Sequence, residues 1–158
     1  MSKLDLRKLP LGEEILQHLR EDDWFMEAQS RRVSAELTQL REHMDHFDGK
    51  RTVFIREVVS LVAELPQVLA RSSGGERASR VKGLSREALQ LREGLESAFN
   101  TFMRGAYRSL CNEEVQIEDP HLLAFRSAIV DRFRSVIEPD TKACLSVIDT
   151  LIDRCKSI

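Results

Sequence analysis

The stretch that decides the fold is residues 16–47, which read LQHLREDDWFMEAQSRRVSAELTQLREHMDHF. Positions spaced alternately three and four apart carry apolar residues, except that Asp23 and Ser30 occupy two of them. The apolar members of this register are Leu16, Leu19, Met26, Val33, Leu37, Leu40, Met44 and Phe47. This spacing is a heptad repeat. It predicts a helix over residues 13–47, about 50 Å long, with a stripe that other helices must cover.

Residues within the stripe and just after it favour a break or an end of this helix. Asp22 or Asp23 can cap a new start, so two shorter helices are an alternative to one long one. Gly49 suits the left-handed conformation that closes helices, which predicts an end at 48–50. A second and strongly apolar helix is then expected over 53–70, where Pro66 should kink it or end it.

The remainder of the chain also favours helices. Residues 71–83 combine two adjacent glycines with almost no apolar side chains, which predicts a flexible basic loop. A helix follows over 85–110, and Asp119-Pro120 is a good opening for the next one, which should stop at 138–141 before a last helix. The expected fold is all-α: an antiparallel bundle of four to five helices over 13–158, with a long heptad-patterned first helix and an irregular segment at 1–12.

Composition limits the classes of function. Of 158 residues, 42% are hydrophobic and 6% are aromatic, with only four prolines and seven glycines, which suits one helical domain. The 24 basic and 26 acidic residues nearly cancel, which argues against a nucleic-acid binder. No stretch is apolar enough for a membrane span, and the N-terminus lacks an export signal. The odd set of Cys111, Cys144 and Cys155 indicates reduced thiols and a cytoplasmic protein.

Candidate chemical groups are sparse. His43 and His46, beside Glu42, could hold a metal or accept a phosphoryl group, but the other helices offer no partner histidine and the surrounding pattern fits neither. An ordinary solvated helix face explains them better. The cysteines and His121 form no known nucleophile motif. We therefore expect a protein that is not an enzyme and needs no cofactor or metal.

Three groups of residues are candidates for binding a partner. Trp24 and Phe25 follow an acidic pair, where they can pack as a hydrophobic staple at a helix break or anchor a partner protein. Heptad positions form a second group, Val33, Leu37 and Leu40. The third group, Arg77, Arg80 and Lys82, belongs to the expected basic loop and could contact an acidic partner or an anionic surface.

These observations favour a helical-bundle protein-interaction module of the adaptor, chaperone or effector type. It would bind a partner protein, or a second copy of itself as a dimer, through coiled-coil contacts of its helix faces. The alternative is a ligand- or metal-sensing bundle in signalling, with an interhelical pocket near the polar register positions Asp23, Ser30 and Ser109. Such positions also specify register in coiled coils, which is the simpler explanation for them.

Overall fold

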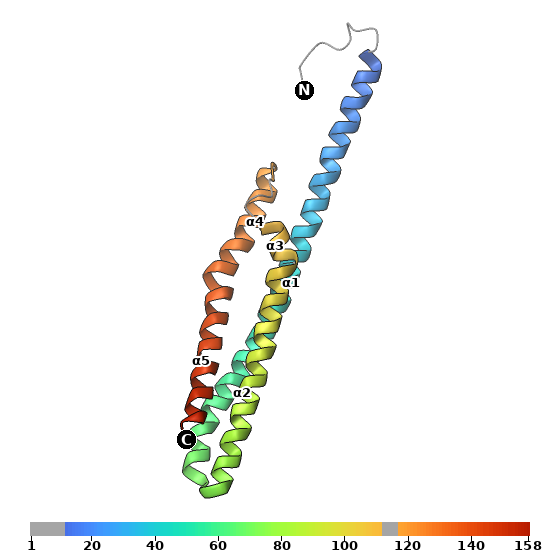
Figure 1. The fold of residues 1–158 in the computed structure, drawn as a ribbon. Helices are drawn as coiled ribbons and strands as arrows, with labels where there is room; N and C mark the ends of the chain where they lie inside the picture. Colours follow the sequence, from blue (N-terminus) through green and yellow to red (C-terminus); the bar gives the residue numbers. More distant parts are fainter. Residues whose placement is uncertain (1–11, 112–116) are drawn as a thin grey trace.

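Helices make up nearly all of the described structure (Figure 1). The computed structural model describes the backbone of residues 12–111 and 117–158, and the side chains within these ranges except those of residues 12–26, 106, 109 and 110. No strand occurs within these ranges. The prediction of an all-α fold is confirmed.

Within the described residues three long helices form the bundle, and the prediction of four to five is wrong. The first is α1, Gly12–Arg71, and the second is α2, Gly74–Phe102. The third consists of α4, Pro120–Arg132, and α5, Glu138–Lys156, joined by the π-helical turn η3, Phe133–Ile137. A second π-helical turn, η2 at Met103–Tyr107, links α2 to the short α3, Arg108–Cys111. Helix α2 runs antiparallel to the other two and packs on both (Figure 1).

Helix α1 is continuous over 60 residues, about 90 Å at 1.5 Å per residue. It passes through Asp22-Asp23 without a break. The predicted end at 48–50 is wrong, because the alternation of three and four continues beyond Phe47 with core-facing positions. These are Arg51, Phe54, Val58, Leu61, Leu65, Val68 and Ser72, all buried except the half-buried Phe54. Gly49 does not adopt a left-handed conformation, and α1 also runs past Pro66 to Arg71.

The turn between α1 and α2 is only Ser72-Ser73, so the predicted flexible loop at 71–83 is also wrong. Gly74 opens α2 with a φ of 60°, which is where the chain needs a glycine. Val81 and Leu84 are buried and continue, toward the N-terminus, the apolar stripe of the rest of α2. The start of α2 has few apolar residues but is helical, because its register positions Val81 and Leu84 pack in the core.

The third long helix begins as predicted and then continues where a stop was expected. The Asp119 carboxylate accepts a hydrogen bond from the His121 backbone N–H at 2.8 Å, the expected cap. The predicted interruption at 138–141 is absent. The core positions Ile129, Phe133, Ile137 and Thr141 are spaced by four throughout, one residue more than a heptad allows, and the π-helical turn absorbs that residue.

An aromatic cluster holds one end of the bundle together. Phe133 is 1% exposed, and its ring lies 4.4–6.0 Å, between centroids, from the rings of Tyr107, Phe102 and Phe99. Phe47 stacks on Phe102 at 5.7 Å. These contacts join α1, α2, η2 and η3, so the cluster fixes α1 and the third long helix at the level where α2 ends.

Candidate functional site

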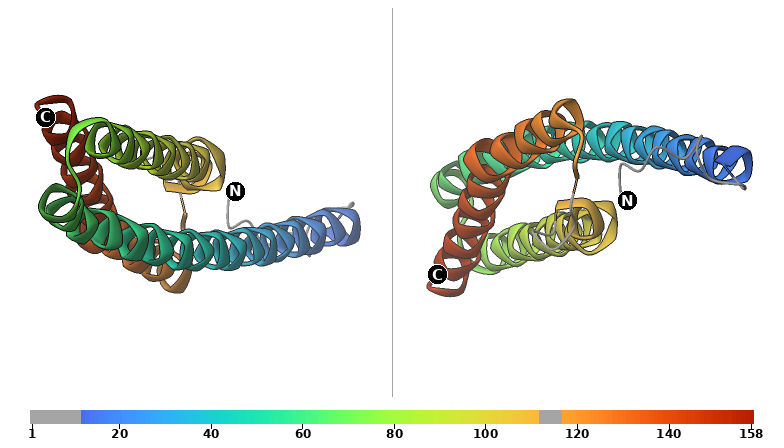
Figure 2. Two further views of the ribbon diagram at one scale, coloured as in Figure 1. Left: turned by 90° about the horizontal axis from the view of Figure 1, so that it is seen from below. Right: turned by 90° about the horizontal axis from the view of Figure 1, so that it is seen from above.

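The most unusual feature of the molecule is the N-terminal part of α1, which projects beyond the other described helices (Figures 1 and 2). Among the side chains that the structure describes, Val33 is the first along α1 that packs against the core. We call residues 12–32 the α1 extension. The register of the buried residues runs through it unchanged, at Leu16, Leu19, Asp23, Met26 and Ser30. The extension thus repeats a pattern that elsewhere in α1 is covered by α2, α4 and α5.

Of the three heptad residues proposed as partner contacts, two lie inside the bundle and one lies at its edge, next to the α1 extension. Leu37 and Leu40 are completely buried in the bundle, so the expectation that they form an exposed interaction surface is corrected. Val33 is half-buried at the edge of the core. The covered and uncovered parts of the stripe have the same sequence pattern, so only the positions of the other helices distinguish them.

Trp24 and Phe25 lie inside the α1 extension, within a continuous helix. The helix break at which they were expected to act as a staple is absent. Their side chains lie outside the described residues. In the sequence they stand between the heptad positions Asp23 and Met26.

The basic residues at the start of α2 have mostly structural roles. Arg77 donates hydrogen bonds from Nε to the Ser72 carbonyl at 2.9 Å and from Nη2 to the Leu69 carbonyl at 2.7 Å. It therefore satisfies carbonyls at the C-terminal end of α1, which an α-helix leaves without partners. Arg80 pairs with Glu76 one turn away, at 3.3 Å. Only Lys82 is exposed without an ion pair to a described residue, so this region is a helix cap rather than a basic loop.

A shallow groove of about 540 Å³ between α1 and α2 contains the candidate histidines. His43, His46 and Lys50 line it from α1, opposite Ser97 and Thr101 of α2. Within the described ranges no three His, Cys, Asp or Glu side chains are grouped as metal ligands. Of the polar residues expected around a pocket, Ser30 lies in the α1 extension, and the side chains of Asp23 and Ser109 lie outside the described residues.

The thiols are not arranged for nucleophilic chemistry. Cys144 and Cys155 are buried, and Cys111 is half-buried. Burial raises the pKa of the Cys111 thiol to about 11, although the positive charges of Arg126 and Arg134 act in the opposite direction. Burial raises the pKa of Cys144 and of Cys155 as well. All three therefore stay protonated at neutral pH, and a protonated thiol is a poor nucleophile.

Comparisons with models of protein families, with curated proteins and with solved structures found no match to this chain. None of the described helices is both long and apolar enough to cross a membrane.

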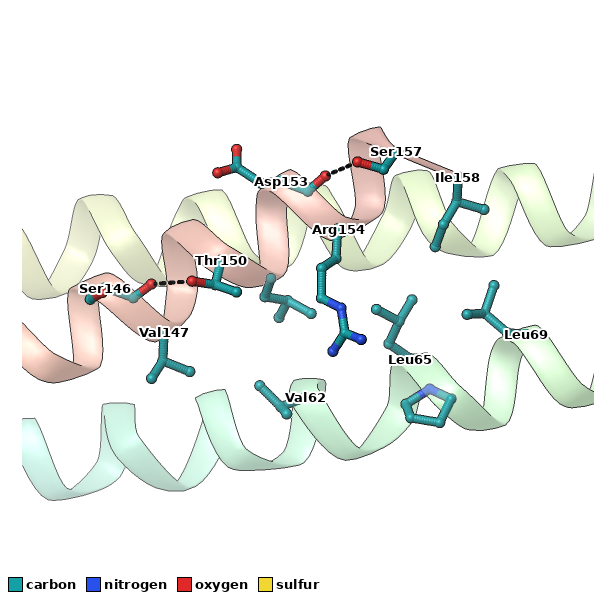
Figure 3. A pocket seen from close by; sticks show the side chains of 12 residues that line it. Val62, Leu65, Leu69, Ser146, Val147, Thr150, Asp153, Arg154, Ser157 and Ile158 are labelled. Atoms are coloured by element: carbon teal, nitrogen blue, oxygen red, sulfur yellow. Dashed lines mark hydrogen bonds between the residues drawn. The ribbon is translucent and has the colours of Figure 1, made fainter.

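A groove of about 730 Å³ between α1 and α5 is the larger surface feature (Figure 3). Leu65 and Leu151 are buried at its floor, while Val62 and Val147 remain 40% and 47% exposed at its sides. Two of its hydroxyl groups are already used, since Thr150 donates to the Ser146 carbonyl and Ser157 to the Asp153 carbonyl, each at 3.0 Å. The groove thus offers a mainly apolar surface along two parallel helices.

Arg154 is the exception in this apolar groove. Its side chain points from α5 toward α1, between Val62 and Leu65, whereas the Asp153 carboxylate points away (Figure 3). Among the described carboxylates, none lies within ion-pairing distance of Arg154. Sequence reasoning missed this residue because one arginine among several near the end of an amphipathic helix carries no distinguishing pattern. Only the packing of α5 beside α1 shows that it faces an apolar surface.

Proposed function

We propose that this chain is a protein-interaction module that acts by binding rather than by catalysis, and that its α1 extension is the binding element. The supporting observation is the register of α1. Positions 33–72 use it to pack against the bundle, and positions 16–30 repeat it where no described helix lies alongside. An amphipathic helix with an uncovered apolar stripe gains stability by pairing with another helix.

Self-association is the simplest form of this proposal, because it requires no second kind of protein. A second copy supplies an identical stripe and identical exposed apolar surface, and most soluble oligomers are symmetric assemblies of one chain. Another protein that presents an amphipathic helix would satisfy the same stripe. In either form the extension, rather than Leu37 and Leu40, makes the contact.

Light scattering over a wide concentration range tests the proposal with a matched pair of variants. Leu19→Asp with Met26→Asp places two charges on the stripe, and Gln17→Asp with Gln29→Asp places the same charges on the extension outside it. We expect the native chain and the glutamine variant to form a dimer, and the stripe variant to be a monomer of 18.1 kDa. Circular dichroism should show similar helicity for all three.

Two results would count against this proposal in different ways. A stripe variant that assembles as well as the native chain would exclude the extension as the interface. A native chain that stays monomeric at every concentration would overturn pairing between copies and restrict the proposal to a different protein partner.

The second candidate function is ligand sensing, favoured by the groove of His43, His46 and Lys50 between α1 and α2. Its lining residues include no carboxylate, and hydroxyl groups face the basic side chains. An anionic ligand suits this set better than a metal ion. A rise in Tm on adding inorganic phosphate, lost in Lys50→Ala but kept in the Lys82→Ala control, would support sensing. An unchanged Tm in the native chain would oppose it.

A further inference from the structure

The groove between α1 and α5 has the size and the apolar character of a small-molecule site. Its volume of about 730 Å³ lies within the range of about 300–1,000 Å³ that ligand sites usually have. The buried side chains of Leu65 and Leu151 form its floor, and Val62, Val147 and Ile158 are 40–53% exposed around it. An occupant with an apolar body would remove this exposed surface from water, which is favourable.

One positive charge stands inside this apolar surface. Arg154 is the only cation among the lining residues, and its guanidinium lies between Val62 and Leu65 without a described carboxylate in ion-pairing distance (Figure 3). The only carboxylate of the lining set points away from the groove. The hydroxyl groups of Thr150 and Ser157 already donate to backbone carbonyls of α5. Arg154 is therefore the group that can hold an anion here.

A single guanidinium specifies the head group of such an anion. Its paired N–H donors match the two oxygens of a carboxylate, and one carboxylate balances its one charge. A phosphate monoester carries about two negative charges at neutral pH, and the groove supplies no second cation for it. The charge of the groove thus favours a carboxylate on an otherwise apolar molecule.

The shape of the groove favours a flexible apolar body over a helix. Helix α5 shares more of its surface with α2 than with α1, and it leads away from α1 toward its C-terminal end (Figure 3). On α1 the lining residues extend only from Val62 to Leu69, about 10 Å or two turns. A straight helix, about 10–12 Å across, contacts both diverging walls over a short distance only. An unbranched hydrocarbon chain can follow the widening floor.

We propose that the α1/α5 groove binds a fatty acid, with its carboxylate on Arg154 and its acyl chain over Leu65 and Leu151. The site is separate from the α1 extension, so this inference goes beyond the proposed function and does not depend on it. The bound chain covers apolar surface that α1 and α5 leave exposed, and it links the C-terminal part of α5 to α1.

Decanoate, kept below the concentration at which it forms micelles, is the probe for this site. Binding is followed by nuclear magnetic resonance of the valine and isoleucine methyl groups. We expect shifts at Val62, Val147 and Ile158, and none at Val53, which is 52% exposed on α1 outside the groove. Octanoate should bind more weakly and dodecanoate more tightly, by about threefold or more for each two methylenes, because buried methylenes add to the affinity.

Arg154→Gln separates the contribution of the head group from that of the chain. It should raise the Kd of decanoate about fivefold or more, and that of the uncharged 1-decanol by less than about twofold. Lys156→Gln is the matched control, since it removes the same charge from α5 at a residue that does not line the groove. Arg154 has no ion pair with a described residue, so its replacement should leave the Tm of the free protein nearly unchanged.

Three results would overturn this assignment. Decanoate that shifts no methyl group, or that shifts Val53 as far as Val62, would show that the groove is not a specific site. An Arg154→Gln variant that binds decanoate as well as Lys156→Gln does would exclude the carboxylate contact. A synthetic amphipathic helix with one glutamate in its apolar stripe that shifts the groove methyl groups, where decanoate does not, would assign the groove to a partner helix instead. None of these results bears on the α1 extension, whose test is the assembly state.

Discussion

Arg51 donates a hydrogen bond from Nη1 to Oδ2 of Asp140 at 2.9 Å, and so joins α1 to the start of α5 across 89 positions of sequence. Arg51 occupies a core-facing position of the α1 register and is only 8% exposed. Its Nε also donates to Oδ1 of Asp48 at 2.9 Å. Burial acts against the charge on Arg51, but the hydrogen bonds to Asp48 and Asp140 outweigh it and raise the pKa of Arg51 above its ordinary value. Arg51 therefore stays charged inside the bundle.

Removing this side chain should destabilise the bundle. We expect Arg51→Ala to lower the free energy of unfolding by about 2–3 kcal/mol, since it deletes hydrogen bonds to charged groups and leaves a space in the core. Arg51→Met should cost less, because it restores the apolar packing that the register position favours. The control Arg32→Ala removes an exposed pair with Glu36 and should change stability by less than about 0.5 kcal/mol. Urea unfolding followed by circular dichroism measures all three, and an Arg51→Ala loss as small as the control would contradict the role given to Arg51.

Two glycines inside helices should respond oppositely to alanine. Gly49 lies in the middle of α1 with nothing within 4 Å of an added Cβ, so Gly49→Ala should stabilise the chain by about 0.5–1 kcal/mol. At Gly94 of α2 an added Cβ would lie 3.0 Å from Cε1 of Phe54, so Gly94→Ala forces that ring to move and should gain less or destabilise. Thermal unfolding of the two variants checks the difference. Equal gains would show that the Phe54 ring yields without cost.

The raised pKa values of the buried thiols predict that the folded protein loses stability at alkaline pH. Burial raises the pKa of Cys111 from 9.0 to about 11 in the folded chain, and it also raises the pKa of Cys144, Cys155 and Tyr107. An unfolded thiol therefore loses its proton first, so the contribution of Cys111 is complete below about pH 9 and is lost as the pH rises through about 11. Urea unfolding at pH 8 and pH 10.5 should show this decline. In Cys111→Ala the decline should be smaller, and an unchanged pH dependence would exclude Cys111 as a cause.

The aromatic cluster predicts a large effect of a single truncation. Phe133→Ala should lower the free energy of unfolding by about 3–5 kcal/mol, because its ring is fully enclosed by Phe99, Phe102 and Tyr107. Phe125→Ala serves as the control, since that ring is half-buried and lies under the guanidinium of Arg41. Its loss should be clearly smaller. Similar losses at the two positions would mean that the aromatic cluster is no more tightly packed than the half-buried surroundings of Phe125.

Much of the fold could be predicted from the spacing of apolar residues. The helix ends were predicted wrongly where a glycine or a proline was expected to interrupt a helix whose apolar register continues. Gly49 was expected to end a helix and Pro66 to kink one or end it, yet α1 and its register continue through both residues. A single glycine costs about 1 kcal/mol in a helix, which is small beside the burial of the leucines and valines on either side. The same continuity of register would have predicted that α2 includes Val81.

Other features of the fold could not be predicted from the sequence of a single helix, because they depend on contacts between helices. The steps of four at Ile129, Phe133, Ile137 and Thr141 indicate an irregularity, but the π-helical turn that absorbs it depends on how α4 and α5 pack on α1 and α2. Arg51 could have been noticed as a polar residue in the α1 register. Its partner Asp140 lies in the third long helix, and no local pattern connects the two.

The sequence by itself determined that the chain is helical and which face of each helix is apolar, because the period of hydrophobic residues depends only on backbone geometry. The tertiary structure decided which parts of those faces are covered. Leu37 and Leu40 are core, the matching positions of the α1 extension have no described helix beside them, and Arg154 faces an apolar groove. The physical reason is that a heptad stripe shows only that a helix has an apolar face to be covered. The lengths of the helices and the positions of the turns between them determine which helix, if any, covers that face.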